Sequence, residues 1–451
     1  MVNNLLLAYY GDDFTGSTDA LEALTLAGVP TVLFFEPPDA QALERFPGVR
    51  AVGLAGHARG RSPAWMHAHL APALAALARL GAPVLQYKVC STFDSSPAIG
   101  SIGCAIDIGV PLMRGDWSPS IVGVPRLGRY QAFGHLFAVA QGEGHRLDRH
   151  PTMSRHPVTP MAESDLRLHL GAQTQRRRAL VDFTQLKRDG GDAALQLARK
   201  GADVPVVFID VLDDETLRAA GRLVWQQRGA GVFSASSSGL QYALAAHWQA
   251  IGLVETPQPL PAAGPVDRVA VVSGSCSPGT AAQIAWAADH GFALHRLHVP
   301  RLLADGGAET ARAVDAAAAA LARGASPLVY SAAGPDDPAV LGFDAHAAAA
   351  GLSRSDAALR TGQALAHVMR GLLDRVPALR RVAVAGGDSS GEVAAALGVQ
   401  ALTMHARLAP GAPLCRAASA SAARDGLELV LKGGQMGGPD FFGIVRDGHP
   451  P

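Results

Sequence analysis

Two adjacent aspartates follow the first apolar run of the chain. Asp12 and Asp13 stand directly after the strand-like segment Leu5–Tyr10, and Thr15 comes just before a helical pattern. Ligands of open α/β sheets bind at the carboxyl ends of strands, so either carboxylate could orient a substrate hydroxyl or accept its proton. The same residue types also favour a turn and a helix N-cap, and this segment alone leaves both interpretations open.

A lysine and a hydroxyl-rich cluster end another strand-like segment, Val84–Val89. Lys88 lies inside this apolar run, and a lysine there requires a partner or a ligand. Ser91, Thr92 and Asp94 follow. The cation and the hydroxyls could hold the carboxylate of a polyol acid, while the aspartate could accept hydrogen bonds from its hydroxyls. The alternative is an edge-strand lysine that points into solvent beside a polar turn.

Basic and imidazole side chains gather in the segment Gln131–Pro160, which has no clear period and which we expect to be a long functional loop or insertion. Arg129 stands just before this segment, and His156 stands near its end. Both are candidates to contact a carboxylate. Isolated histidines are more often structural, so a functional interpretation of this segment depends on the neighbouring motifs.

Three small-residue loops, each after a predicted strand, distinguish the second half of the chain. In the first, Ser273–Thr280, Ser277 suits a helix N-cap and Pro278 suits the first helical position. The free N–H groups of such a helix start, together with small hydroxyl side chains such as Ser275, make an anion site. No Gly-Lys-Ser/Thr follows the glycines, so this is not a Walker loop.

The other two loops repeat this pattern. In Gly386–Glu392 two glycines let the backbone approach a phosphate, and Ser389 forms a capping-box pattern with the final glutamate. Asp388 could hold Mg²⁺. In the third loop Lys432 stands beside four glycines and could neutralise phosphate charge. Glycine is common in turns, but three such loops in one domain favour a nucleotide site.

Short apolar runs alternate with helical patterns along the chain, which predicts two α/β domains with mainly parallel sheets. The proline-rich segment Glu255–Pro265 can continue neither a helix nor an inner strand. We therefore predict an N-terminal domain over 1–254, a linker over 255–264 and a C-terminal domain over 265–451. The predicted strands are Leu5–Tyr10, Thr31–Phe35, Ala51–Leu54, Val84–Val89, Ile121–Val124, Val206–Asp210, Gly231–Ser234, Val269–Ser273, Leu294–His298, Leu328–Ser331, Val382–Ala385, Leu402–Met404 and Leu427–Leu431.

The composition limits the class of protein. Hydrophobic residues make up 48% and charged residues 17%, so a large core can form. Lys plus Arg and Asp plus Glu both number 39, which argues against general attraction to nucleic acid. Four scattered cysteines indicate neither a zinc site nor a disulfide framework. The N-terminus lacks the pattern of a signal peptide and no apolar stretch reaches the ~18 residues of a membrane helix, so we expect a cytoplasmic protein without a membrane partner.

Together these motifs resemble the four-carbon acid sugar kinase family, formerly a domain of unknown function, over nearly the whole chain. The matching motifs are Asp12-Asp13-Phe14-Thr15-Gly16, Lys88-Val89-Cys90-Ser91-Thr92-Phe93-Asp94-Ser95, Gly128-Arg129, His156-Pro157-Val158-Thr159-Pro160-Met161, Ser273-Gly274-Ser275-Cys276-Ser277, Gly386-Gly387-Asp388-Ser389 and Lys432-Gly433-Gly434-Gln435-Met436-Gly437. In that family the N-terminal domain binds the sugar acid, the C-terminal domain binds ATP, and the active site lies in the interdomain cleft. Members phosphorylate the terminal hydroxyl of threonate, erythronate or 3-oxo-tetronate, and some act on a branched relative, 3-oxo-isoapionate.

The resemblance implies a kinase that uses ATP and Mg²⁺ and takes a small sugar acid as its other partner. Asp12 or Asp13 would orient or deprotonate the hydroxyl, and Asp388 is the candidate for Mg²⁺. The implied contacts to the acid are Thr15, Lys88, Ser91, Thr92, Asp94, Arg129 and His156. The implied contacts to ATP are Ser275, Ser277, Gly386, Gly387, Asp388, Ser389, Lys432, Gly433 and Gly434.

The chain departs from the family pattern at Lys432–Gly437, at Ile99–Gly103 and in the basic loop Arg146–Arg155. The last two changes lie on the sugar side, so the interpretation as a kinase is kept and the exact acid is left open. A nucleotide-dependent oxidoreductase is an alternative, but the Gly-x-Gly-x-x-Gly expected after the first strand is missing. A non-catalytic sugar-acid binding protein is another. The oligomeric state is open, with a homodimer as one expectation.

Overall fold

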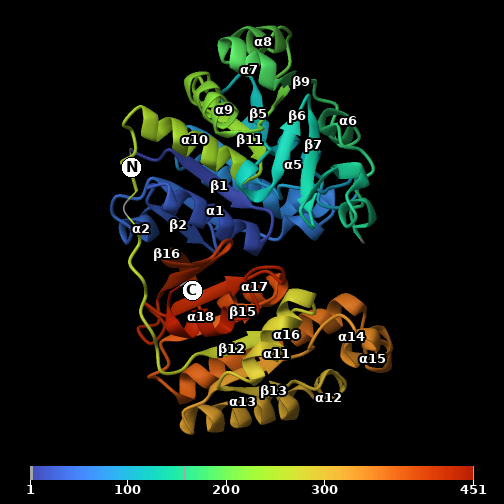
Figure 1. Ribbon diagram of the computed structural model, residues 1–451, viewed down its shortest axis with the longest axis vertical. Helices are drawn as coiled ribbons and strands as arrows, with labels where there is room; N and C mark the ends of the chain where they lie inside the picture. The colour runs from blue at the N-terminus through green and yellow to red at the C-terminus, as the bar shows by residue number, and fades with distance from the viewer. Residues whose placement is uncertain (1–3, 157, 258, 450–451) are drawn as a thin grey trace. The chain divides into compact units, whose positions relative to one another are not determined.

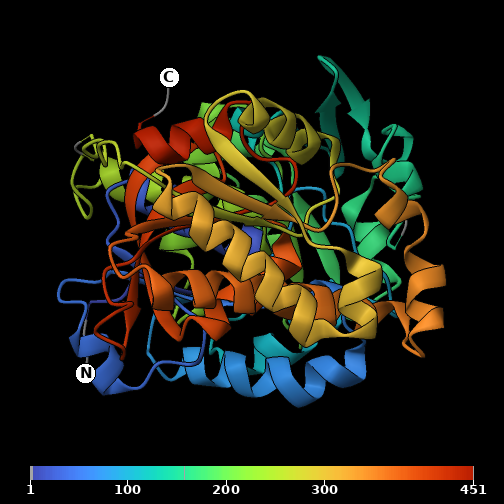
Figure 2. The same ribbon diagram turned by 90° about the horizontal axis from the view of Figure 1, so that it is seen from below.

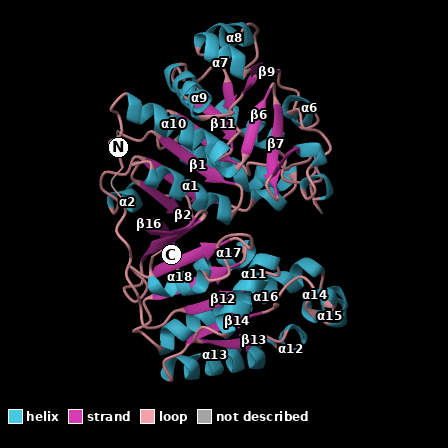
Figure 3. Cartoon of the chain, viewed as in Figure 1, coloured by secondary structure: helices cyan, strands magenta, loops and turns pink. Residues whose placement is uncertain are grey.

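The computed structural model describes residues 4–156, 158–257 and 259–449 of the chain (Figures 1 and 3). The chain forms two compact units, Met1–Pro259 and Leu260–Pro451, which we call the N-terminal and the C-terminal domain. Both are mixed α/β units, so the predicted fold class is confirmed. No helix in the described ranges is long and apolar enough to cross a membrane.

Three sequence predictions touch residues that the structure does not describe. The N-terminal segment examined for a signal peptide begins with Met1–Asn3, which lies outside the described residues. So do Pro157 of the basic motif and Gln258 of the proline-rich segment. The domain limits 1–254 and 265–451 stay a prediction. All four cysteines are free, as the sequence indicated.

Five parallel strands form the main sheet of the N-terminal domain, in the order β11-β4-β1-β3-β2. Figure 1 labels β11, β1 and β2. Every residue of these strands is buried, which explains why the sequence shows continuous apolar runs instead of an alternating pattern. Helices α1 and α10 pack on one face, and α4 and α5 pack on the other. The bounds are β1 Leu7–Gly11, β2 Thr31–Phe34, β3 Ala51–Ala55, β4 Val84–Lys88, β11 Val232–Ser236, α1 Phe14–Leu26, α2 Ala40–Glu44, α3 Pro63–Trp65, α4 Ala71–Ala78, α5 Ile102–Gly109 and α10 Ser238–Ala250.

A second, smaller parallel sheet joins this domain in the order β5-β10-β9. The predicted strand Ile121–Val124 is wrong, because the strand lies just before it at β5. The backbone N–H of Ile121 donates to the hydroxyl of Ser236, at 2.8 Å, and not to a strand carbonyl. The bounds are β5 Ser118–Ser120, β9 Arg178–Val181, β10 Val206–Ile209, α6 Leu166–Gly171, α7 Phe183–Asp189, α8 Asp192–Ala198 and α9 Asp214–Gln226.

The segment Gln131–Pro160, predicted to be a loop, contains most of a three-stranded antiparallel sheet (teal in Figure 2). Its strands are β6 Arg129–Ala132, β7 His135–Ala140 and β8 Glu143–Arg146. Phe133 and Gly134 form the first turn, with φ of 51° and 81°, as in the primed turns that suit hairpins. Their N–H groups donate to the carboxylate of Asp210, at 2.5 and 3.0 Å. Burial raises the pKa of Asp210 to about 6, and these hydrogen bonds oppose that rise.

The sheet of the C-terminal domain has the order β16-β17-β18-β15-β12-β14-β13. Strand β17 is antiparallel to both neighbours. It was not predicted, because its sequence contains three alanines and a proline, residue types that are depleted in strands. Helices α13, α16 and α17 form one layer on this sheet (α13 and α16 in Figure 2), and α11 and α18 pack on the other face. The bounds are β12 Ala270–Ser273, β13 Phe292–Arg296, β14 Ser326–Tyr330, β15 Arg381–Ala385, β16 Val399–Ala409, β17 Ala412–Ser419, β18 Glu428–Lys432, α11 Pro278–Ala288, α12 Val299–Ala304, α13 Gly306–Ala322, α14 Pro338–Leu341, α15 Phe343–Ala349, α16 Arg354–Arg375, α17 Gly387–Ala396 and α18 Phe441–Asp447.

We predict that Gly221→Ala destabilises the protein, although alanine favours a helix over glycine by about 1 kcal/mol. A Cβ on Gly221 of α9 would lie 1.8 Å from the carbonyl oxygen of Ala243 in α10, so the two helices would have to separate. Overpacking of this kind costs about 1–3 kcal/mol. Thermal unfolding of the full chain measures it. Gly144→Ala is the matched control, because nothing lies within 4 Å of a Cβ there. Equal melting temperatures for the two variants would contradict the prediction.

Candidate active site

The paired aspartates stand where β1 ends and α1 begins. The side chain of Asp12 is 5% exposed, and that of Asp13 is 30% exposed. Asp13 is the N-cap of α1, and its Oδ1 accepts the N–H of Gly16 at 2.5 Å. The N-cap interpretation is therefore confirmed for Asp13, and its second oxygen points to a further partner. Thr15 lies in the first turn of α1 and is partly exposed.

That partner is Arg59, a residue that the sequence predictions missed. Its Nη1 lies 2.6 Å from Oδ2 of Asp13. Its Nε and Nη2 donate to Oδ2 and Oδ1 of Asp12, at 3.1 and 2.7 Å. Its backbone N–H also donates to the carbonyl of Asp12, at 3.0 Å. The residue follows β3, the neighbour of β1 in the sheet, so a basic residue just after that strand was the signal that could have found it.

Burial acts strongly on the carboxyl group of Asp12. It raises the pKa of Asp12 to about 6, and the negative charge of Asp13 acts in the same direction. The cations of Arg59 and Lys88 oppose the rise. The two cations thus favour the ionised form of Asp12, and burial favours the neutral form.

Lys88 ends β4 and is 3% exposed. Its Nζ lies 3.2 Å from Oδ2 of Asp19 on α1. The interpretation as an edge-strand lysine in solvent is therefore wrong. A Cβ on Gly16 would lie 3.3 Å from this Nζ and 3.7 Å from Nη2 of Arg59. The first turn of α1 thus approaches both cations closely, and Gly16 leaves room for them.

The hydroxyl-rich cluster after β4 folds over its own aspartate. Oγ1 of Thr92 donates to Oδ1 of Asp94 at 2.5 Å, and both residues are buried. Phe93 between them has φ of 54°, which is uncommon for a residue with a Cβ and marks a locally strained turn. The charges of Asp94 and Arg59 both act on the thiol of Cys90, so this turn lies next to the paired aspartates. Burial raises the pKa of that thiol. Ser91 is half-buried in the same turn.

Arg129 and His156 make local contacts. Nη1 of Arg129 donates to the carbonyl of Leu127 at 2.8 Å, and its buried Nε has no hydrogen-bond partner among the described residues. The ring of His156 contacts the hydroxyl of Thr159 at 3.0 Å. Within the part of the chain that the structure describes, no hydrogen bond or ion pair joins either residue to the aspartates. Their role in binding an acid stays a prediction.

Hydroxyl groups of the first small-residue loop of the C-terminal domain contact the backbone of the third loop. Ser277 is the N-cap of α11 and Pro278 its first residue, as predicted. The hydroxyl of Ser277 donates to the carbonyl of Gly434 at 2.6 Å. A Cβ on Gly434 would lie 2.7 Å from the hydroxyl oxygens of both Ser275 and Ser277, so only glycine fits. Gly433 precedes it and is half-buried.

The second loop approaches the first through glycine as well. Gly386 has φ of 125° and stands at the start of α17, where a Cβ would lie 3.3 Å from the backbone nitrogen of Ser275. The predicted capping box is wrong, because Gly387 already begins α17 and Ser389 lies inside the helix. A Cβ on Gly274 would lie 2.1 Å from the hydroxyl of Ser389. The structure therefore brings all three loops together.

Lys432 ends β18 beneath these loops and is fully buried. Its Nζ lies 3.2 Å from Oγ1 of Thr280, and no carboxylate pairs with it among the described residues. Burial lowers its pKa to about 8. A buried ammonium group without an anion, under loops whose glycines expose the backbone, fits a phosphate group.

The acidic groups near these loops are few. Asp388 is exposed in the first turn of α17. Burial and the charge of Asp388 raise the pKa of Glu392 on the next turn. No cluster of three or more His, Cys, Asp or Glu side chains that could hold a metal ion occurs among the described residues. Mg²⁺ at Asp388 stays a prediction.

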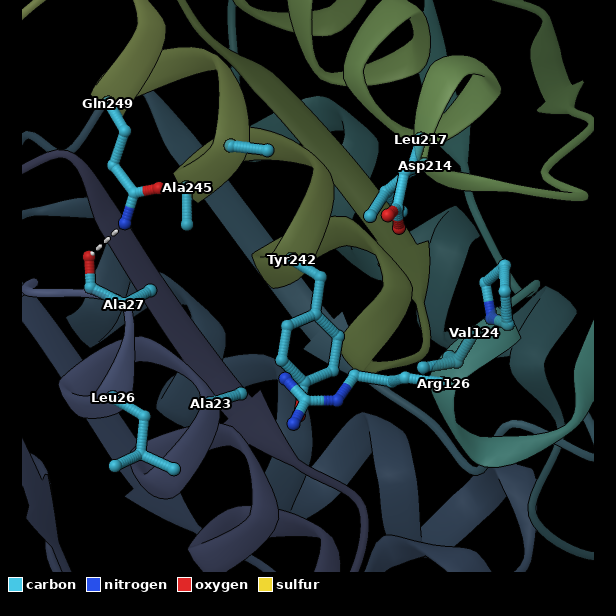
Figure 4. A pocket seen from close by; sticks show the side chains of 12 residues that line it. Ala23, Leu26, Ala27, Val124, Arg126, Asp214, Leu217, Tyr242, Ala245 and Gln249 are labelled. Carbon is cyan, nitrogen blue, oxygen red and sulfur yellow. Dashed lines mark hydrogen bonds between the residues drawn. The ribbon is translucent and has the colours of Figure 1, made fainter. Parts of the chain in front are cut away.

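The N-terminal domain also contains a cavity of about 450 Å³ behind α1, bordered by α9 and α10 (Figure 4). The guanidinium group of Arg126 stacks on the ring of Tyr242, 4.7 Å from the ring centroid. Asp214 and Gln249 also line the cavity. None of the predicted site residues lines it. It is separate from the paired aspartates.

Two family models match the chain. A sugar-binding N-terminal domain matches residues 7–244, and a nucleotide-binding C-terminal domain matches residues 270–442. The 3-oxo-isoapionate kinase of Paraburkholderia graminis is 65% identical over 448 residues, which cover 99% of this chain and 95% of that protein. The 3-oxo-tetronate kinase of Cupriavidus necator is 32% identical over 440 residues, which cover 97% and 95%.

Solved structures agree on the fold. A Salmonella typhimurium LT2 protein, provisionally described as a tRNA synthase, superposes with a TM-score of 0.77 at 26% identity and covers 98% of both chains. A Haemophilus influenzae protein from a family of unknown function superposes with a TM-score of 0.72 at 24% identity, over 97% of this chain and 98% of that one.

The two matches describe a sugar-binding domain followed by a nucleotide-binding domain, and the two curated relatives above are kinases. The curated relatives share this architecture over almost their whole length. The chain belongs to the four-carbon acid sugar kinase family, and it is a sugar-acid kinase. The resemblance seen in the sequence is confirmed, and the oxidoreductase and non-catalytic interpretations are not favoured.

We predict that Lys432→Met weakens the use of ATP. Loss of a charged hydrogen bond to a phosphate costs about 1.5–3 kcal/mol, so kcat/KM for ATP falls about 10- to 100-fold. In the wild type kcat/KM for ATP also falls above about pH 8, because Lys432 of the free enzyme then loses its proton. The variant lacks this alkaline limb. Steady-state kinetics between pH 6 and pH 9.5 measures both effects.

Lys187→Met is the matched control, because it removes a surface lysine that pairs with Asp213 and Glu215 in the N-terminal domain. Its pH profile matches the wild type. If calorimetry finds equal ATP affinity in Lys432→Met and the wild type, Lys432 does not contact the phosphates and the prediction is wrong.

Proposed function

We propose that the protein phosphorylates the terminal hydroxyl of a branched sugar acid, 3-oxo-isoapionate, at the expense of ATP and with Mg²⁺. The observation that supports this acid is the 65% identity to a 3-oxo-isoapionate kinase, against 32% to a 3-oxo-tetronate kinase. 3-Oxo-tetronate, threonate and erythronate are the alternative substrates. ATP is a substrate of the cytoplasm, which supports our expectation of that location.

The different exposure of the two aspartate side chains supports different roles for them. Asp13 is the more exposed of the two, so we assign it the contact with the hydroxyl that is phosphorylated. When bound, ATP supplies the phosphoryl group and leaves as ADP. The chain's own residues orient the hydroxyl and accept its proton, and Lys432 meets the phosphate charge.

The charge of the acidic cluster supports a place for the substrate carboxylate. Asp12, Asp13, Asp19 and Asp94 supply four negative charges, while Arg59 and Lys88 supply two positive charges that Asp12, Asp13 and Asp19 already engage. An anionic acid that placed its carboxylate there would be repelled. We therefore assign the carboxylate to the basic side chains beyond this cluster.

Arg129 and His156 are our candidates for that role. The buried and unpartnered Nε of Arg129 supports the assignment, because a buried donor without an acceptor is costly unless a ligand supplies one. Thr15, Ser91 and Thr92 then lie nearer the hydroxyl end of the acid. This arrangement separates a cationic end from an acidic end of the site, as a sugar acid requires.

ADP release in a coupled assay, with a panel of four-carbon acids and their oxo derivatives, tests the proposal. We expect 3-oxo-isoapionate to give the highest kcat/KM, about 10-fold or more above 3-oxo-tetronate, because one substituent in a fitted pocket is worth about 1–3 kcal/mol. Faster turnover of an unbranched acid would contradict the choice of substrate. ATP binding without turnover of any acid would contradict the proposed reaction and favour a binding protein.

A further inference from the structure

One guanidinium group holds both carboxylates of the pair. Three nitrogens of Arg59 contact three oxygens, two on Asp12 and one on Asp13, at 3.1, 2.7 and 2.6 Å. A backbone hydrogen bond from Arg59 to the carbonyl of Asp12 fixes the loop that carries it. Arginine matches this task because its five donors lie in one rigid plane, which a lysine cannot reproduce.

The carboxylate of Asp12 is buried, and that of Asp13 is partly accessible to a substrate. Both oxygens of Asp12 face Arg59, and its side chain is 5% exposed. Asp13 gives one oxygen to the start of α1 and the other to Arg59, and it is 30% exposed. A substrate hydroxyl can therefore reach Asp13. Asp12 contacts only the guanidinium group with its two oxygens, among the described residues, and so helps to orient Arg59.

We propose that Arg59 is a positioning residue of phosphoryl transfer: its guanidinium group holds the Asp13 carboxylate towards the substrate hydroxyl and anchors both oxygens of Asp12 behind it. This inference rests on the proposed function and deepens it at the same site. Arg59 is 29% exposed and its hydrogen-bonding face is occupied by the aspartates, so it does not serve as the grip for the acid's carboxylate.

The electrostatic surroundings support this role. The groups that face Asp12 are Asp13, Arg59, Lys88 and the rings of Tyr10 and Tyr87. Of the two cations, Lys88 has its own partner in Asp19. The charge of Arg59 therefore makes the largest contribution that lowers the pKa of Asp12, against the rise caused by burial. Without Arg59, that pKa rises further and Asp13 loses its second anchor.

The test compares Arg59→Gln, which removes the charge, with Arg59→Lys, which keeps the charge but cannot make all three contacts. We expect kcat with the acid substrate to fall roughly 10²-fold or more in Arg59→Gln, because a misplaced catalytic group costs about that much. KM for ATP stays within about 2-fold, since ATP binds the other domain. The acid limb of kcat moves to higher pH in Arg59→Gln, and Arg59→Lys keeps the limb near the wild type while kcat stays low.

Carboxyl-carbon NMR of protein labelled with [4-¹³C]aspartate gives a readout that needs no turnover. Asp12→Asn and Asp13→Asn assign the two resonances, and a pH titration follows each. The Asp12 signal titrates at higher pH in Arg59→Gln than in the wild type. Arg312→Lys is the matched control. Nε and Nη2 of Arg312 donate in a similar bidentate way to the two carboxylate oxygens of Glu309 in the C-terminal domain, at 3.0 and 2.5 Å.

The outcomes separate this inference from the proposed function. Arg59→Gln with activity within 3-fold of the wild type would overturn the positioning role. So would lower activity with an unchanged acid limb and an unchanged Asp12 titration, since a merely structural ion pair would behave in that way. A wild-type protein that phosphorylates no acid, but whose Asp12 titration shifts in Arg59→Gln, would overturn the proposed function and leave the electrostatic role of Arg59 standing.

Discussion

Charge buried at the carboxyl edge of a parallel sheet is the constraint on which both domains depend. A buried charge without a partner is costly, and the two domains meet this cost differently. In the N-terminal domain Arg59 and Lys88 each contact carboxylates of the same chain. In the C-terminal domain the ammonium group of Lys432 has the hydroxyl of Thr280 as its one hydrogen-bond partner among the described residues. The cations of the N-terminal domain are thus paired with carboxylates of the chain. The ammonium group of Lys432 has no such partner among the described residues, so a bound anion would stabilise it.

Glycine provides the second constraint, because it lets distant loops meet. Gly434 lies more than 150 positions after Ser277, and the hydroxyl of that serine donates to its carbonyl. Gly386 brings the backbone of the second loop to Ser275. A side chain at Gly434 would displace the hydroxyls of Ser275 and Ser277, and one at Gly386 would crowd the backbone of Ser275. The proposed phosphate site therefore consists of exposed backbone above one buried cation.

Much of the site could be predicted from local sequence, because strand ends are local features. Asp12, Asp13, Lys88 and Lys432 all stand at the end of an apolar run, and the structure places each at a strand terminus. Arg59 was missed because it lies several residues after the end of β3 and not at a strand terminus. It lies in a segment without a motif, and only the order β4-β1-β3 in the sheet brings it to the aspartates. Strand order is a long-range property that apolar runs do not reveal.

Other predictions failed because one pattern allows two structures. A serine followed three positions later by glutamate can cap a helix or lie inside it, and Gly387 settles the matter by beginning α17 before Ser389. The basic segment Gln131–Pro160 hides its strands because they are short and because β6 and β8 are mainly polar. The turn between β6 and β7 is held by Asp210, nearly 80 positions from Phe133.

The two turns of that small sheet differ in a way that matters for engineering. The β6–β7 turn is anchored by a buried carboxylate and cannot change length without losing both N–H contacts. The β7–β8 turn, at Gln141 and Gly142, has no space restriction on a Cβ at the glycine and faces solvent. A peptide tag or a fluorophore inserted at the β7–β8 turn would therefore report on the domain while leaving its scaffold undisturbed.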